Sequence, residues 1–416
     1  MEGEINNLIL VWSIVVASLC YTHKVAQIFP TGNPRIIAIF PIIILFLLLP
    51  LNFTSIHFSG ITSFFISWLS TFKLLLLTFN QGPLSSHPPI PLSLFLPLAC
   101  FPIKIQQSPK KPHKSPLNPV VKVTILALLI RVYAYKSHIH PHIIMLCYAL
   151  HMYLMLEMIL SLFAAAVKAL ARVELEPHFN EPYLATSLQD FWGRRWNLMV
   201  SNILHPTVYR PVRAASARLG LGRWAAIPAV LATFLVSGLM HELIFYNIGR
   251  MRPSGEMIGF FLLHGVSLSL EIVVKKMCEG RLRLPRAVAG VLTLGYVIYT
   301  SFWLFFPPFL RAKSDLRSCR ESLAFMEFVR NRRLVEPSVQ TVTSGLIVVR
   351  FNEFNFMVVN LNLDWWQKFE FLKHSTNFFP IVDFVSLFFT IAFKTLKCIG
   401  LALIDAEYYF SNTKQI

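Results

Sequence analysis

The sequence predicts an all-α, polytopic integral membrane protein with about eight transmembrane helices. Of its 416 residues, 55% are hydrophobic and only 14% are charged, whereas a soluble domain carries about 25% charged residues. The apolar residues gather in stretches that could span or nearly span a bilayer. The basic excess, a net charge of +17, lies in short segments between those stretches. That distribution is typical of a membrane protein and not of a nucleic-acid-binding face.

Eight apolar stretches follow one another along the chain. The first begins after Glu2 and Glu4 without a basic segment, so it is predicted to be a retained span and not a cleaved signal. The first, second and fourth are shorter than the ~20 residues that a spanning helix needs, so their flanks must contribute or the span must be tilted or buried. The stretches are residues 8–21, 36–51, 61–79, 119–133, 139–167, 224–248, 257–274 and 287–306.

The connecting segments alternate in charge. Segment 82–118 is rich in proline and lysine, and proline at that density cannot continue a helix, so it is predicted to be an exposed loop. Two further basic segments are 168–223 and 275–286. Two spans separate each basic segment from the next, so the positive-inside rule places all three in the cytosol.

Residues 187–205, SLQDFWGRRWNLMVSNILH, are predicted to form an amphipathic helix in the cytosolic loop. At ~100° per residue, Asp190, Arg194, Asn197 and Ser201 fall within one narrow stripe, and apolar side chains fall opposite. The helix therefore has an organised polar edge.

Trp192 and Trp196 in this helix suit the boundary between membrane and water. An interfacial anchor and a functional element are equally compatible with the periodicity. The amide of Asn197 can both donate and accept hydrogen bonds. Such a group suits acyl transfer, where a hydroxyl or a developing oxyanion must be held.

The stretch 231–248, LATFLVSGLMHELIFYNI, places His241 and Glu242 inside a predicted span. Ionisable groups at that depth cost several kcal/mol, so their default interpretation is functional. An imidazole titrates near neutrality and can act as a general base. Ser237 lies one helical turn before His241, and Gly238 opens space beside it. A purely structural histidine is the alternative.

The next span carries His264, Ser267 and Glu271 on one helical face, at spacings of three and four residues. They are expected to line a cavity or to orient His241, or His264 and Glu271 pair structurally. The sequence contains no G-x-S-x-G, Walker or H-E-x-x-H motif, and its six cysteines are scattered. No metal site or cofactor is predicted, and direct transfer assisted by a base is favoured over a covalent enzyme intermediate.

Two blocks carry a resemblance to a known family. FWGRRWN at 191–197 and VSGLMHELIFY at 236–246, followed by FFLLHG at 260–265, resemble the membrane-bound O-acyltransferases, in particular the plant wax synthase branch. The resemblance is strongest over 177–308. It implies a multi-span enzyme of the endoplasmic reticulum membrane, which transfers a fatty acyl group from acyl-CoA to a long-chain fatty alcohol and forms a wax ester.

The resemblance also assigns residues. The intramembrane histidine of the family corresponds to His241 and the asparagine of its tryptophan-rich block to Asn197, which are the predicted catalytic pair. The basic segment 168–223 is expected to attract the CoA phosphates, with Arg194, Arg195 and Arg210 as candidates. Arginines that only set the membrane topology are the alternative for most of them. The side chains predicted to bind substrate are Trp192, Arg194, Arg195, Trp196, Ser237 and His264.

The resemblance divides the chain into a membrane domain, 1–310, and an atypical extension, 311–416, in which 378–403 is a possible further membrane helix. Two other functions stay open. The acceptor could be a sterol, because the shape of the pocket selects it. A transporter could also bury His241, His264 and Glu271 as a proton relay, although no internal repeat of the kind expected in a transporter is evident.

Overall fold

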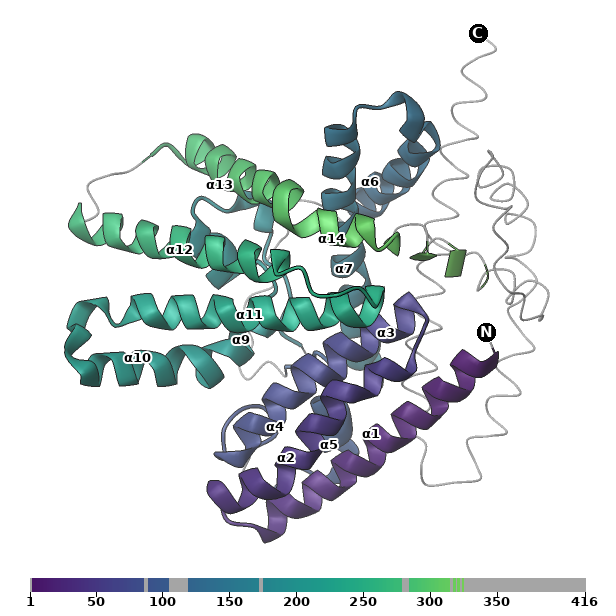
Figure 1. The fold of residues 1–416 in the computed structure, drawn as a ribbon, viewed down its shortest axis with the longest axis vertical. Helices are drawn as coiled ribbons and strands as arrows, with labels where there is room; N and C mark the ends of the chain where they lie inside the picture. Colours follow the sequence, from purple (N-terminus) through teal and green to yellow (C-terminus); the bar gives the residue numbers. More distant parts are fainter. Residues whose placement is uncertain are drawn as a thin grey trace. The chain divides into compact units, whose positions relative to one another are not determined.

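The computed structural model describes residues 2–85, 89–104, 119–171, 175–278 and 284–314, and five positions between 317 and 324. Its regular elements are helices (Figure 1), as predicted. The chain divides into two compact units, residues 1–104 with 177–323, and residues 105–176 with 324–416. The first unit contains every residue predicted for the site.

Seven helical segments among the described residues are long and apolar enough to cross a membrane. The polytopic class is thus confirmed, but the count of eight is not. The predicted span at 119–133 is α6 (Pro119–Val132), whose 14 residues rise about 21 Å, less than the ~30 Å hydrocarbon core. The seven segments are Gly3–Ile28, Asn33–Asn52, Ile56–Thr78, Pro141–Ser161, Ala226–Gly249, Glu256–Met277 and Arg286–Arg311.

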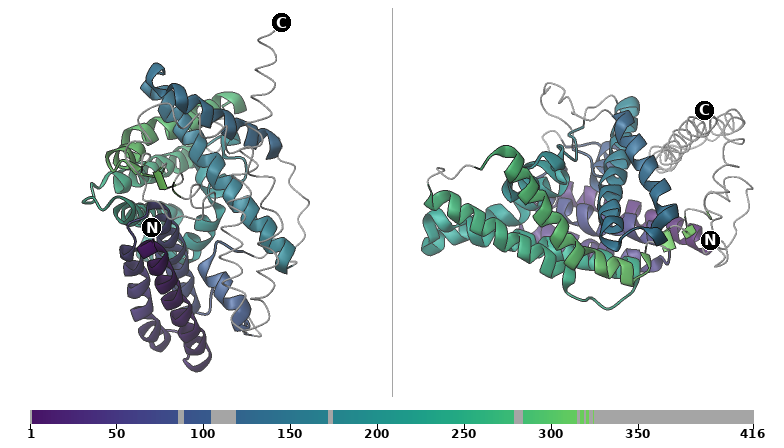
Figure 2. Two further views of the ribbon diagram at one scale, coloured as in Figure 1. Left: turned by 90° about the vertical axis from the view of Figure 1, so that its right-hand side faces the viewer. Right: turned by 90° about the horizontal axis from the view of Figure 1, so that it is seen from above.

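The N-terminal helices of the first unit lie side by side (Figure 1, Figure 2), with α1 against α2 and α5, and α2 against α4. The third span consists of α3, the π-helical η2 and α4. Ser70 and Lys73 donate side-chain hydrogen bonds to carbonyls at the end of α5, which fix this span. The elements are α1 (Glu2–Ile28), α2 (Asn33–Leu48), η1 (Leu49–Asn52), α3 (Ile56–Thr62), η2 (Ser63–Ser70), α4 (Thr71–Thr78) and α5 (Leu92–Cys100).

The second part of this unit begins with short helical segments, of which α9, η6 and α10 follow one another without a break, and η6 and α10 lie along α11 (Figure 1). It ends in three spans, of which α11 and α12 lie against each other. The short elements are η4 (Pro182–Leu184), α8 (Leu188–Asp190), η5 (Phe191–Arg195), α9 (Leu198–Leu204), η6 (His205–Tyr209), α10 (Arg210–Ser216), η7 (Ala217–Leu221) and η8 (Gly222–Trp224). The spans are α11 (Ala226–Gly249), α12 (Glu256–Met277) and α13 (Arg286–Thr300), which continues through η9 (Ser301–Phe305) into α14 (Phe306–Arg311).

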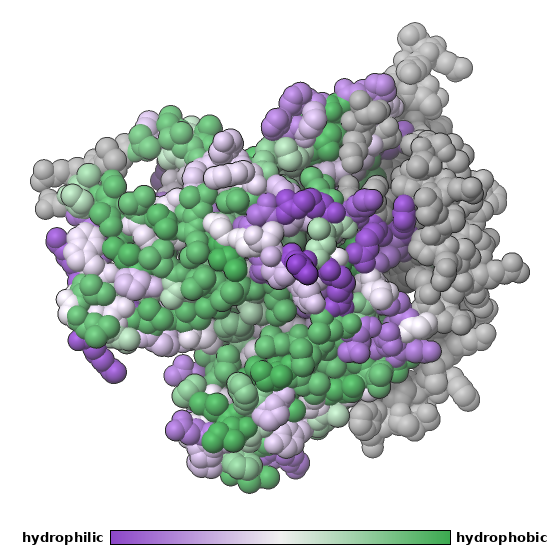
Figure 3. Space-filling model, in the orientation of Figure 1, coloured by the Kyte–Doolittle hydropathy of each residue, from purple (hydrophilic) through white to green (hydrophobic). Residues whose placement is uncertain are grey.

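Hydrophobic side chains cover much of these spans on the face shown in Figure 3. On α12, Val266, Leu270 and Val274 are 46%, 59% and 44% exposed. Their spacing of four residues puts them on one face of the helix. Exposed apolar side chains in such a row match a lipid-facing surface, whereas His264 on the opposite side is fully buried.

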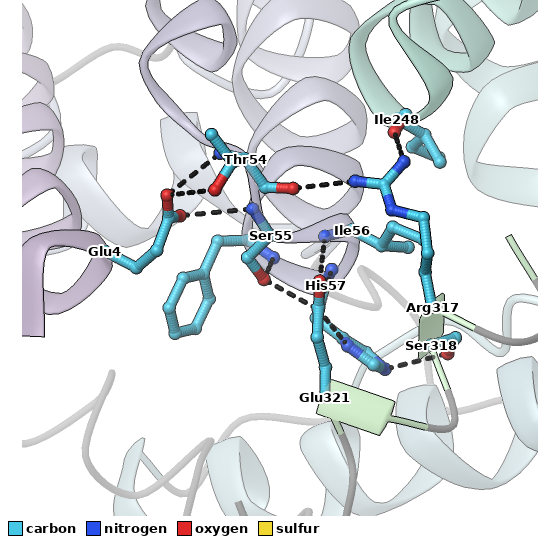
Figure 4. A network of polar contacts seen from close by, with 10 residues as sticks. Glu4, Thr54, Ser55, Ile56, His57, Ile248, Arg317, Ser318 and Glu321 are labelled. Atoms are coloured by element: carbon cyan, nitrogen blue, oxygen red, sulfur yellow. Dashed lines mark hydrogen bonds and ion pairs between the residues drawn. The ribbon is translucent and has the colours of Figure 1, made fainter. Parts of the chain in front are cut away.

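A polar network joins three helices of the first unit at one end (Figure 4). The carboxylates of Glu4 and Glu321 accept backbone hydrogen bonds at the start of α3, and Arg317 donates to the carbonyl of Ile248 in α11. Burial acts to raise the pKa of Glu321, but hydrogen bonds from His57 and the start of α3 outweigh it and lower that pKa. The network requires the ionised form of Glu321.

The second unit contains a helical hairpin of α6, η3 (Tyr133–His138) and α7 (Pro141–Ala171). A buried ion pair of 2.7 Å between Lys122 and Glu157 connects the two long helices. The possible membrane helix at 378–403 lies outside the described residues, as do residues 86–88 and 105–118 of the predicted loop 82–118. The described part of that loop contains α5, which continues through Pro97 and buries Phe95 and Leu98, so the prediction of an exposed loop is wrong there. The division at residue 310 stays a prediction.

Candidate active site

His241 lies in the middle of α11 and is held by a hydrogen bond to its own helix. Its Nδ1 is 2.8 Å from the carbonyl oxygen of Ser237, one turn earlier. A carbonyl only accepts hydrogen bonds, so Nδ1 carries the proton in the neutral ring. The lone pair is therefore on Nε2, for which the structure gives no protein partner among the described residues. This tautomer can accept a proton from a substrate at Nε2.

Aromatic rings from three other helices surround this imidazole. Phe261 of α12 stacks on it with ring centroids 4.2 Å apart. Trp68 of η2 contacts it edge-on at 4.8 Å, and Phe305 of η9 at 6.2 Å. Apolar rings lower the local dielectric, which strengthens electrostatic interactions with a reacting group.

The stretch 187–205 is not the single amphipathic helix that its periodicity predicts. The helix is interrupted at Trp196, which is extended, and at Asn197, which has the left-handed φ of 40°. The side-chain oxygen of Asn197 accepts a hydrogen bond of 3.4 Å from Val200 N and so caps α9. Asparagine tolerates this backbone conformation better than most residues and is a favoured cap. The predicted polar stripe therefore does not exist as one face.

Trp192, His264 and Thr300 form a hydrogen-bonded relay that connects η5, α12 and α13. The indole of Trp192 donates to Nδ1 of His264 over 3.1 Å, and an indole can only donate. Nε2 of His264 must then carry the proton, and it lies 2.9 Å from the hydroxyl of Thr300. Both nitrogens of His264 are therefore occupied by protein groups.

The neighbours of His264 on α12 have other partners. Glu271 accepts a hydrogen bond from Leu188 N at the start of α8 and pairs with Lys275. The hydroxyl of Ser267 lies 2.6 Å from that of Tyr296. The predicted pairing of His264 with Glu271 is therefore wrong. Glu271 instead binds the N-terminal end of α8.

The remaining predicted substrate residues differ in their surroundings. Arg195 pairs with Asp190 at 2.7 Å and donates to the carbonyl of Asn180, so it has a structural role. The ring of Trp196 stacks on Phe191, whereas Arg194 is exposed. Ser237 contributes its carbonyl to the site.

The structure brings together some of the predicted residues and not others. Phe261 contacts both Trp192, at 5.8 Å, and His241, at 4.2 Å, and so connects the tryptophan-rich block to the imidazole. The hydrogen bond of Asn197 within the described residues is to its own turn, and its side chain is not among the ring and hydrogen-bond contacts of His241. Direct contact of the predicted catalytic pair is therefore not present.

A cleft of about 610 Å³ lies between the segment after α4 and the helical elements η6 and α10. It is lined by Arg210 together with Gln81, Gly82 and Pro206. Partial burial, and then the positive charges of Arg210 and Arg213, lower the pKa of the neighbouring His205. The cleft thus combines space with a positive potential.

Comparison with known proteins agrees with this architecture. The sequence model of the membrane bound O-acyl transferase family matches residues 175–263, which contain both His241 and the broken helix. Acyl-CoA–sterol O-acyltransferase 1 of Arabidopsis thaliana is 48% identical over 76% of this chain and 94% of its own length. The chain belongs to the membrane-bound O-acyltransferase family.

Other relatives within the family have a different name. The long-chain-alcohol O-fatty-acyltransferase of Simmondsia chinensis is 40% identical over 80% of this chain and 97% of its own length. Probable long-chain-alcohol O-fatty-acyltransferase 3 of Arabidopsis thaliana is 42% identical over 80% of this chain and 98% of its own length. This acyltransferase thus has relatives of both kinds over most of its length, and the enzyme is favoured over the transporter interpretation.

One residue of the acyltransferase site was missed by the sequence analysis. Trp68 belongs to the third span, where eight consecutive residues form the π-helix η2, and it contacts His241 directly. A tryptophan in an apolar stretch carries no periodic signal that separates it from an ordinary core residue. Its place beside the imidazole follows only from how α2, η2 and α11 pack.

Replacing His264 with leucine is expected to destabilise this acyltransferase by about 2–4 kcal/mol, because the indole N–H of Trp192 loses its acceptor and the buried hydroxyl of Thr300 loses one of its hydrogen bonds. The indole of Trp192 and the hydroxyl of Thr300 would be left without this partner. Thermal unfolding of the detergent-solubilised protein measures the change. Ser267→Ala, one turn along α12, is the control and should cost less, because its hydroxyl is half-buried. Equal stability of His264→Leu and the wild type would contradict the relay.

Proposed function

We propose that this acyltransferase transfers a fatty acyl group from acyl-CoA to the hydroxyl of a long-chain alcohol, giving a wax ester and CoA. The observation that carries the proposal is the tautomer of His241, whose Nδ1 is occupied by Ser237 O and whose Nε2 can accept a proton. The choice of a long-chain alcohol as the acceptor rests on the relatives that are named long-chain-alcohol O-fatty-acyltransferases. Acyl-CoA is a substrate, and no cofactor is proposed.

The reaction requires one proton transfer at each stage. Nε2 of His241 takes the hydroxyl proton while the alcohol oxygen attacks the thioester carbon. The tetrahedral intermediate then breaks its carbon–sulfur bond, and the imidazolium returns the proton to the departing thiolate. The ester and CoA are released, and the imidazole is neutral again. No covalent bond to the enzyme is needed.

Asn197 is proposed to donate a hydrogen bond to a reacting oxygen. Its side-chain oxygen accepts the hydrogen bond that caps α9 and so orients the amide. The NH2 group is the part of this side chain that could then bind a substrate. An amide NH2 can only donate. A donor suits the oxyanion of the tetrahedral intermediate. This role requires that the tryptophan-rich block approach His241 when substrate binds.

The CoA phosphates are proposed to bind in the cleft that contains Arg210. Its volume of about 610 Å³ and the positive potential around His205 suit an anionic nucleotide. Arg195, which the sequence also suggested, is engaged by Asp190. The predicted cytosolic side of this segment is where acyl-CoA would arrive, and the endoplasmic reticulum membrane is the proposed location.

A sterol is the second candidate acceptor. The 48% identity to a relative named as an acyl-CoA–sterol acyltransferase favours it. Both acceptors present a hydroxyl to the same base, so His241 does not distinguish them, and the shape of the pocket does.

The acceptor is tested in microsomes that lack endogenous neutral-lipid acyltransferases and that express this chain. Labelled acyl-CoA is supplied with either a long-chain alcohol or a sterol. We expect labelled wax ester with the alcohol at a rate at least tenfold above the sterol ester. Sterol ester alone would replace the first proposal by the second. The absence of both esters from folded protein would reject acyl transfer to either acceptor.

A further inference from the structure

Trp68 combines a ring contact with His241 and a buried hydrogen-bond donor that has no acceptor within the described residues. Its side chain is 1% exposed, and its ring contacts that of His241 edge-on at 4.8 Å with an interplanar angle of 79°. Its indole nitrogen is buried and has no hydrogen-bond partner within the described residues. An indole N–H can only donate. A donor without an acceptor thus lies beside the proposed base.

Three polar side chains close to Trp68 in the same span have acceptors. Ser67 donates to the carbonyl of Phe46 in α2 over 2.7 Å, and Ser70 donates to the carbonyl of Ala99 in α5 over 2.7 Å. Lys73 reaches the carbonyl of Leu98 over 2.6 Å. These hydrogen bonds to backbone carbonyls of α2 and α5 anchor the span. Buried donors are normally paired, and an exception calls for an explanation such as a catalytic role.

The backbone around Trp68 is also unusual. Residues Ser63–Ser70 form a π-helix of eight residues, whereas π-helical turns are rare, usually single and frequent at functional sites. Ser67 and Ser70 fix this stretch on both sides. The wide turn thus presents the indole to α11 from a rigid support, which is what a preorganised hydrogen-bond donor requires.

We propose that the Nε1–H of Trp68 donates a hydrogen bond to the carbonyl oxygen of the acyl thioester while that oxygen becomes negatively charged. The inference rests on the proposed acyl transfer and adds a catalytic residue to it. Nε2 of His241 takes the proton of the acceptor hydroxyl, the carbon–oxygen bond forms, and the carbonyl electron pair moves to the oxygen beside the indole. Collapse of the intermediate returns that pair as the carbon–sulfur bond breaks and the thiolate takes the proton.

A hydrogen bond from Trp68 would have a large effect because the rings of Trp68 and His241 lie together in an apolar site. Trp68 and Phe261 both contact the ring of His241, so a substrate hydroxyl bound at Nε2 would react beside apolar rings. A hydrogen bond to a developing charge is worth far more in such a site than in water. The donor gains most in the transition state, because the carbonyl oxygen carries little charge before attack.

The test replaces Trp68 with phenylalanine, which keeps an aromatic ring and removes the N–H. We expect kcat for ester formation to fall about 100-fold, as for loss of one oxyanion donor, while KM for acyl-CoA changes less than about twofold. Trp12→Phe is the matched control, because Trp12 is also a span tryptophan packed on a phenylalanine, Phe101. The control should retain wild-type kcat.

A second variant separates the hydrogen bond from packing. Incorporation of benzothienylalanine at position 68 replaces the indole N–H by sulfur and keeps the two-ring shape. The same loss of kcat with an unchanged melting temperature supports the proposal. Wild-type kcat in this variant overturns it and leaves Trp68 as a packing residue. If the wild-type chain forms no ester, the proposed function fails together with this inference, whereas ester from the wild type with equal kcat in the variants rejects the inference alone.

Discussion

Replacing His241 with alanine is expected to lower the rate of ester formation by about 100- to 10,000-fold, the usual contribution of a general base. The tautomer fixed by the Ser237 carbonyl leaves Nε2 as the atom that accepts the proton. Alanine removes that atom but keeps the helix, because it has the highest helix propensity. Initial rates with labelled acyl-CoA, at matched amounts of folded protein, measure the effect.

Two further measurements make this result specific. His140→Ala, an exposed histidine of the second unit, should keep the wild-type rate under the same conditions. The melting temperature of His241→Ala should stay within a few degrees of the wild type. A folded His241→Ala protein with more than about a tenth of the wild-type rate would contradict the role of the base.

The spans could be predicted because hydropathy and charge are local properties. The stretches that became α11 and α12 were located within a few residues of their observed bounds. The stretch 119–133 was misjudged because its hydropathy is high, whereas crossing a membrane depends on the length of the unbroken helix, which is 14 residues. Lys122 of this helix forms an ion pair with Glu157, which lies 35 residues later in the sequence. No local sequence pattern predicts an ion pair between residues so far apart in the chain.

The site was only partly predictable for the same reason. His241 was identified because an ionisable group in an apolar span is costly. The helical projection of 187–205 failed because it assumes 3.6 residues per turn throughout. In the π-helical turn η5 the partner of Asp190 is Arg195, five residues on, whereas the projection aligned Asp190 with Arg194. Trp68 was missed because an unpaired N–H is a property of the packed structure.

Replacing Gly238 with alanine is expected to destabilise the contact between α11 and α12 by about 1–3 kcal/mol. A Cβ at this position would lie 2.9 Å from the Cα of Ile258 and 3.3 Å from the Cβ of Phe261. The first atom belongs to the backbone and cannot rotate away, so the helices must separate. Because Phe261 stacks on His241, activity should fall with stability. Thermal unfolding and ester formation are measured on the same preparation.

Gly259→Ala is the matched control, because a Cβ at Gly259 has no neighbour within 4 Å. Removal of a glycine from a helix interior alone stabilises by roughly 0.5–1 kcal/mol. The two substitutions should therefore change stability in opposite directions, although each adds one methyl group to a spanning helix. Opposite signs of the two stability changes would show that the effect at Gly238 comes from the close approach of α11 to α12. Equal stabilisation by both would mean that the helices tolerate a wider separation, and the stacking of Phe261 on His241 would then not depend on Gly238.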